Sequence, residues 1–235
     1  MNTAAEQIES SSDIERLRDR GVAELADQFS KARAQIRKMI DMRLDRKLLG
    51  RIDASDVVQE AFIEASRRLP EYLDAPKVSP YMWLRQIGRQ VLAVHYREHV
   101  GTAGRTVHRE AEPGKCPIVN SESVAGQMAA SVASPHSVIA KAELLQKILI
   151  LIESMAPEDR EVLSLKQFEQ LTFQEVALEL NVSMEAAKKR YQRAVIRLGQ
   201  IAAHLKGSSW SWLHLFPMIR FPRHTRNGEI FWMRV

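Results

Sequence analysis

Apolar residues recur at helical spacing along most of the chain. Across Leu25–Leu49 they fall three or four positions apart, which predicts one long amphipathic helix. A second stripe follows Asp53 and Ser55, either of which can cap a helix, and we expect that helix to end before Pro70. A third helix is predicted over Tyr81–His99. Three or four helices with short joints predict a small bundle.

The second half of the chain also has a helical pattern. Helices are predicted from about Ser137 through Ile152 to a break at Pro157, then over 160–170, 172–180 and 184–205. No segment shows a convincing strand-like alternation of apolar and polar residues. The predicted fold class is therefore all-α, with two small helical domains.

Composition suggests where the domains meet. Alanine, serine, glycine and proline dominate residues 101–136, which we interpret as a flexible linker. We predict an N-terminal segment (1–24), a first domain (25–100), that linker (101–136), a second domain (137–206) and an aromatic tail (207–235). The tail holds three of the four tryptophans, and we expect an irregular extension packed on the second domain rather than a docking peptide.

Overall charge and cysteine content narrow the class of protein. The 235 residues carry 34 Lys and Arg against 29 Asp and Glu, a net charge of +5 that suggests a polyanionic partner if it is clustered. One cysteine, Cys116, excludes an internal disulfide framework and favours a reducing compartment. With no signal peptide or membrane span in the sequence, we expect a cytoplasmic protein.

The clearest motif lies between Thr172 and Leu198. Thr172 and Glu175 have the spacing of a capping box, and Ser183 can cap the helix that follows a tight turn at Asn181. This is the pattern of a helix-turn-helix. Residues 184–206 hold six Lys and Arg against one acid, a net +5 in 23 residues. A helix of this kind fits the DNA major groove, so we favour DNA binding over a merely solvated basic face.

A rival motif is His95-Tyr96-Arg97-Glu98-His99, which matches the H-x-x-E-H pattern of some zinc peptidases. Two histidines four residues apart on a helix could share a zinc ion, with Glu98 as the base. A pattern of five residues is weak evidence for a zinc site. We therefore favour the interpretation that these are two partly exposed histidines near a helix end, which tolerate or contact a polyanion. Because Cys116 lies in the predicted linker, we interpret it as a bystander thiol. No catalytic residue, metal site or cofactor is predicted.

Three stretches together resemble the bacterial RNA polymerase sigma factors of the extracytoplasmic-function (ECF) group. They are Asp53–Ala65, Trp83–Arg89 and Thr172–Leu180 with the basic helix behind it, and the resemblance covers roughly Leu17 to Leu205. It implies a non-enzymatic factor with two domains, region 2 and region 4. Such a factor binds core RNA polymerase and directs promoter recognition, promoter melting and transcription initiation. The alternative is a stand-alone helix-turn-helix regulator.

The resemblance also implies roles for individual residues. An acidic face would bind the clamp helices of the largest polymerase subunit, while region 4 would dock on the polymerase flap. Promoter DNA would be the other partner, and an anti-sigma factor a possible regulator. The implied polymerase-binding residues are Asp53, Asp56, Gln59, Glu60 and Phe62; the implied minus-ten residues are Trp83, Arg85, Arg89, Gln90, His95 and Arg97. The implied minus-thirty-five residues are Ser183, Lys188, Lys189, Arg190, Gln192, Arg193 and Arg197.

Three positions depart from the pattern of the group. Many relatives have asparagine where Gln90 stands, at the turn that would receive a flipped non-template base. A common Gly-Thr pair in the recognition helix is replaced by Glu185-Ala186, and a carboxylate there would repel a nearby phosphate. We therefore expect Lys188, Lys189, Gln192 and Arg193 to carry most of the recognition.

Overall fold

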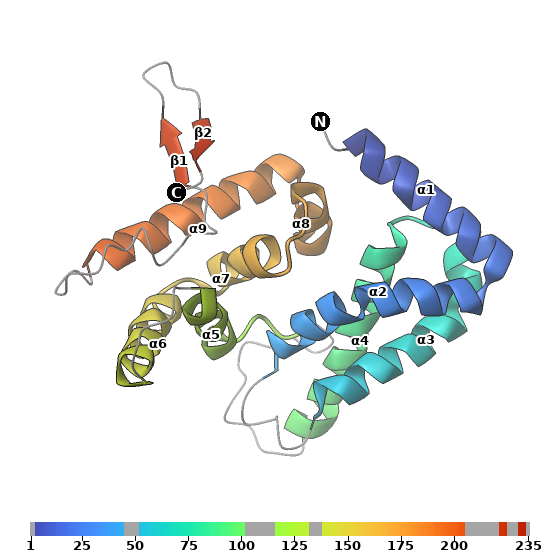
Figure 1. The fold of residues 1–235 in the computed structure, drawn as a ribbon, viewed down its shortest axis with the longest axis horizontal. Coiled ribbons are helices and arrows are strands. Elements are labelled where there is room, and N and C mark those ends of the chain that lie inside the picture. The colour runs from blue at the N-terminus through green and yellow to red at the C-terminus, as the bar shows by residue number, and fades with distance from the viewer. Residues whose placement is uncertain are drawn as a thin grey trace. The chain divides into compact units, whose positions relative to one another are not determined.

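A computed structural model describes residues 3–44, 52–101, 116–131, 138–204, 221–224 and 230–233. The chain divides into two compact units, residues 1–117 and 118–235 (Figure 1). The boundary lies inside the predicted linker.

The first unit contains four helices within its described residues: α1 (Thr3–Arg20), α2 (Val22–Asp41), α3 (Ala54–Asp74) and α4 (Pro80–Gly101) (Figure 1). Helices α2, α3 and α4 pack against one another, as the predicted bundle requires. Helix α1 lies in the segment left without a predicted element, and Gly21, with φ of +55°, separates it from α2. Residues 45–49 of the predicted first helix lie outside the described residues.

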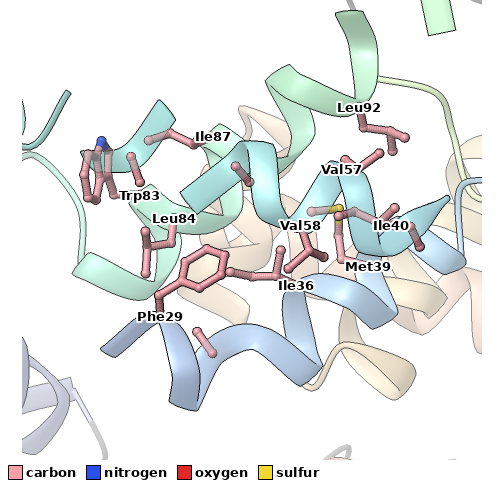
Figure 2. Packing of buried hydrophobic residues seen from close by; sticks show 14 of the residues in the cluster. Phe29, Ile36, Met39, Ile40, Val57, Val58, Trp83, Leu84, Ile87 and Leu92 are labelled. Atoms are coloured by element: carbon pink, nitrogen blue, oxygen red, sulfur yellow. The ribbon is translucent and has the colours of Figure 1, made fainter. Parts of the chain in front are cut away.

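The core of the first unit lies between α2, α3 and α4. Figure 2 shows Ile36 and Met39 of α2 directed toward Val58 of α3, with Leu84 of α4 nearby. These residues are at most 1% exposed. The stripes that predicted the helices therefore form one apolar cluster.

Helix α3 continues four residues past Pro70, so the predicted end before that proline is wrong. A proline inside a helix loses one backbone hydrogen bond and crowds the preceding turn. Tyr72 offsets that loss, since its ring stacks on Trp83 at 4.2 Å between centroids. Its hydroxyl donates to the Val78 carbonyl at 2.8 Å. Tertiary contacts thus hold the last turn of α3 in helical form.

The second unit confirms the predicted helices and adds another. Its helices are α5 (Ser121–Ser131), α6 (Val138–Glu153), α7 (Pro157–Leu163), α8 (Phe173–Leu180) and α9 (Met184–His204), with a π-helical turn, η1 (Ser164–Phe168), after α7. The all-α fold class is therefore confirmed for both domains. Pro157, predicted as a break, is the first residue of α7, where a proline needs no backbone donor.

Helix α5 corrects the linker prediction for residues 121–131. The Asn120 side chain accepts hydrogen bonds from the backbone of Glu122 and Ser123 at 2.8 and 3.2 Å, which starts the helix. Val124 and Met128, four residues apart, are buried, and α5 packs on α6. Its apolar side chains are small and few, which made the helical pattern hard to recognise. Residues 102–115 and 132–137 of the predicted linker lie outside the described residues.

The tail contains a short antiparallel hairpin, although the sequence indicated no strand. Strand β1 (Phe221–His224) pairs with β2 (Ile230–Met233), with Phe221 opposite Met233 (Figure 1). Each strand has only four residues, too few to show a convincing alternation. The Asn227-Gly228 dipeptide between them is typical of hairpin connections and was the overlooked signal.

Candidate polymerase and nucleic-acid interfaces

Helix α3 presents an exposed polar face. Asp53 caps it, because its carboxylate accepts from the Ser55 backbone N–H at 2.7 Å, and this bond lowers the pKa of Asp53. Asp56, Gln59 and Glu60 follow at helical spacing, and all three are exposed. The structure therefore brings the predicted polymerase-binding polar residues onto one surface.

Phe62, the fifth residue of that predicted set, does not share this exposed surface. It is half-buried, packs against the core cluster and places its ring 5.1 Å from that of Phe29. Phe62 thus anchors α3 on α2 and leaves only part of its ring for a partner.

Helix α4 does not present all of the predicted minus-ten residues. Trp83 is 9% exposed and stacks on Tyr72, while Arg85 is 0% exposed. Arg85 falls in the same helical stripe as Gly88 and Leu92, which face α2 and α3. Trp83 and Arg85 are therefore core residues in this structure, and their contact with DNA stays a prediction.

The other four predicted residues of α4 all keep some exposure, although His95 lies on a different side of the helix from Gln90 and Arg97. Gln90 and Arg97 are exposed, and Arg89 is half-buried. His95, with 15% of its side chain exposed, has its Nε2 atom 2.9 Å from Glu60 Oε2. Two residues that were assigned to different partners are therefore paired with each other across α3 and α4.

Sequence reasoning missed a second link between these helices. Arg68 of α3 donates from Nη1 to Gln90 Oε1 at 2.7 Å. Glu64, one turn before Arg68, accepts from Arg68 Nε at 2.6 Å and lies 2.5 Å from its Nη2. The i,i+4 spacing of Glu64 and Arg68 in the sequence indicates the ion pair. The contact of Arg68 with Gln90 could not be predicted in this way, because it depends on how α3 packs against α4.

In the second unit, α8, a turn and α9 form the predicted helix-turn-helix. Thr172 Oγ1 accepts from Glu175 N at 3.2 Å, and Glu175 Oε2 accepts from Thr172 N at 2.8 Å, which completes the capping box. Asn181 adopts the left-handed conformation (φ 50°) that ends α8. Ser183 Oγ then accepts from Ala186 N at 3.2 Å. Local hydrogen bonds thus fix the turn on both sides.

The basic residues of α9 lie on the side away from the domain core. Ala187, Tyr191, Ala194, Val195 and Leu198 form its buried face. Burial raises the pKa of the Tyr191 hydroxyl to about 12. Lys189 and Arg193 are exposed, while Lys188, Arg190 and Gln192 are half-buried. The predicted recognition residues are thus accessible, although Lys188 also pairs with Glu185 at 3.0 Å.

Two members of the predicted minus-thirty-five set have structural contacts. Arg197 Nη1 lies 2.5 Å from Asp159 Oδ2, which joins α9 to the first turn of α7. Asp159 keeps only 10% of its side chain exposed, against 53% for Arg197. Ser183 uses its hydroxyl as a helix cap. Both residues therefore support the position of α9.

The structure shows no complete set of metal ligands around the rival zinc motif in the part of the chain that it describes. Within those residues no cluster of three His, Cys, Asp or Glu could hold a metal ion. His95 faces Glu60, and the His99 side chain lies outside the described residues.

Cys116, the single cysteine, is half-buried against the core of the first unit. Among the described helices, none is both long and apolar enough to cross a membrane.

Comparison with known proteins identifies both units. Residues 42–101 match the family Sigma-70 region 2, and residues 145–198 match Sigma-70, region 4. No curated protein matches the sequence. A solved structure, CnrH in complex with the cytosolic domain of CnrY, is similar at 18% identity and a TM-score of 0.44, over 85% of this chain and 97% of that one. Region 2 of the sigma-70 family thus falls on the α3–α4 bundle and region 4 on the helix-turn-helix, and these two domains support a sigma factor role in transcription initiation.

Proposed function

We propose that the first unit binds core RNA polymerase through the exposed face formed by Asp53, Asp56, Gln59 and Glu60 of α3. Sigma factors as a family bind RNA polymerase and promoter DNA. The clamp helices of the largest subunit are the proposed partner, because their basic residues would complement these carboxylates. Region 4 would dock on the polymerase flap while its α9 helix faces DNA.

The exposed parts of α4 form the proposed minus-ten surface. Arg89, His95 and Arg97 would hold phosphates, and Gln90 would contact an everted non-template base. Flipping a base costs a few kcal/mol, which contacts at the capture site must return. The factor makes no covalent change, since opening the promoter requires only that unstacked bases be bound.

Helix α9 is the proposed minus-thirty-five reader. Its exposed Lys189 and Arg193, with the half-buried Lys188, Arg190 and Gln192, form a basic and amide-bearing side near the start of the helix. That placement is the one by which a recognition helix contacts base edges and phosphates. The observation that carries the proposal is that one chain holds both this capped basic helix and the exposed acidic face of α3.

Reconstituted transcription tests the proposal. The full chain, added to core RNA polymerase and a promoter library, should give transcripts that start at specific sites. Asp56→Lys should weaken binding to polymerase and leave binding of the full chain to duplex DNA intact. Glu71→Lys is the matched control, because Glu71 is an exposed acid on α3 about four turns away.

The outcomes separate the sigma factor from the stand-alone regulator. A regulator would bind duplex DNA with normal affinity and yield no factor-dependent transcripts. Equal loss of polymerase binding in Asp56→Lys and Glu71→Lys would remove the proposed interface. An anti-sigma partner and a cytoplasmic location stay predictions.

A further inference from the structure

We infer that Arg68 orients the Gln90 amide so that Gln90 turns its two hydrogen-bond donors toward the base, which makes Arg68 a positioning residue for base choice. The inference rests on the proposed function, in which Gln90 contacts the everted base. It assigns a role to the Glu64–Arg68–Gln90 chain of contacts. It also predicts which class of base the factor prefers.

The orientation follows from the chemistry of the two groups. A guanidinium has five N–H donors and no acceptor, so the Gln90 atom facing Arg68 must be the oxygen. The amide nitrogen of Gln90, with its two donors, then points away from Arg68. Because Gln90 is exposed, these donors are open to an incoming base.

Glu64 holds Arg68 in place for this purpose. Its Oε1 atom lies 2.6 Å from Arg68 Nε and 2.5 Å from Nη2, while Nη1 is left for Gln90. A planar guanidinium held on one edge has a fixed direction on the other. Glu64 is 26% exposed and Arg68 43%, so water competes only in part for the contact.

Where they meet the exocyclic group of the base, the two Gln90 donors discriminate between bases of the same size. Thymine carries the O4 acceptor where cytosine carries the N4 amine, and guanine carries the O6 acceptor where adenine carries the N6 amine. An amine donor would face the Gln90 donor and lose its partner, which is costly once water is excluded. We therefore expect thymine over cytosine and guanine over adenine at the position that Gln90 contacts.

The test uses holoenzyme made from the full chain and core RNA polymerase. The affinity of this holoenzyme is measured for fork-shaped templates that differ only in one unpaired non-template base of the minus-ten element. Gln90→Leu first identifies the position whose base preference depends on Gln90. There the unchanged holoenzyme should favour thymine over cytosine by about tenfold, the scale of one base-edge contact.

Variants of Arg68 then separate orientation from charge. Arg68→Met should abolish the preference for thymine over cytosine, and Arg68→Lys should restore part of it. Arg67→Met is the matched control, since Arg67 lies 3.7 Å from Glu64 with 74% of its side chain exposed. Glu64→Gln gives a second route should Arg68→Met fail to fold, and it should also reduce the preference.

Three results would overturn the inference. The first is an unchanged preference in Arg68→Met when Gln90→Leu has lost it, which would leave the proposed function intact. The second is a wild-type preference for cytosine or adenine. The third is equal weakening of all templates with a shallower salt dependence, which would make Arg68 a phosphate contact. Failure of the unchanged holoenzyme to bind any fork would instead reject the proposed function.

Discussion

His95 Nε2 of α4 lies 2.9 Å from Glu60 Oε2 of α3, so one contact connects the proposed polymerase face with the proposed minus-ten face. Glu60 keeps 54% of its side chain exposed and remains accessible to a partner. A change at Glu60 therefore acts in two ways. It removes a carboxylate from the α3 surface and releases His95 on α4.

A double-mutant cycle separates these effects. We expect Glu60→Ala to weaken polymerase binding by the same factor in the wild-type chain and in His95→Ala, because the carboxylate contacts polymerase directly. The pair itself should couple by about 0.2–1 kcal/mol in stability, as partly exposed pairs do. A loss of polymerase binding seen only when His95 is present would show that Glu60 acts through α4.

Arg197 and Lys189 should behave differently although both were predicted to contact DNA. Lys189→Ala should reduce the slope of log affinity against log salt by about one, as loss of one phosphate contact does. Arg197→Ala removes the partner of the nearly buried Asp159 and should lower the hydrogen-exchange protection of α7 and α9. Equal salt slopes for Arg197→Ala and Lys189→Ala, with unchanged protection, would return Arg197 to the DNA-contacting set.

Trp83 should act through stability. Its ring is 9% exposed and stacked on Tyr72, so Trp83→Ala should destabilise the first domain by about 3–5 kcal/mol. Hydrogen exchange of α3 and α4 in the full chain measures this loss. Gln90→Ala, on the surface of the same helix, should change it by less than about 0.5 kcal/mol. A folded Trp83→Ala domain with a selective loss of minus-ten binding would support the predicted contact of Trp83 with DNA.

Gly88 lies where α4 packs tightly against α2. A Cβ atom at this position would lie 3.2 Å from Ile36 Cγ2 and 3.3 Å from Met39 Cε. Gly88→Val adds further atoms there and should destabilise the domain by about 1–3 kcal/mol. Gly88→Ala should be nearly neutral, because the gain of about 1 kcal/mol in helix propensity offsets the tight contact. Thermal unfolding of the two variants checks whether Gly88→Val is less stable than Gly88→Ala.

The sequence predicted most of the fold because the deciding forces are local. Thr172, Glu175 and Ser183 cap helices through bonds that span three residues, and those caps were readable from the sequence. The continuation of α3 past Pro70 was not readable, because the contacts of Tyr72 with Trp83 and Val78 decide it. For the candidate site residues, the sequence did not predict which side chains are exposed and which are buried. Arg85 is charged yet lies in the buried stripe of α4, since the direction of a residue depends on how helices pack.

The pH dependence of the first domain should reflect Glu24. This carboxylate is 4% exposed and accepts from Gln28 Nε2 at 3.2 Å and from Arg20 Nη1 at 2.6 Å. The bond from Gln28, followed by the charges of Arg20 and Arg16, holds the pKa of Glu24 below its ordinary value of 4.5. Because the folded pKa is the lower one, this stabilisation is present above pH 4.5 and is lost as pH falls through the folded pKa.

Glu24→Gln should therefore be less stable than the wild type at neutral pH, and the difference should shrink as the pH falls below 4.5. Hydrogen exchange of the α1 and α2 amides in the full chain, measured over that range, gives the comparison. Glu15→Gln is the control, since Glu15 is an exposed acid on α1. A difference between Glu24→Gln and wild type that stays constant with pH would show that packing of Glu24, and not its charge, stabilises the junction of α1 and α2.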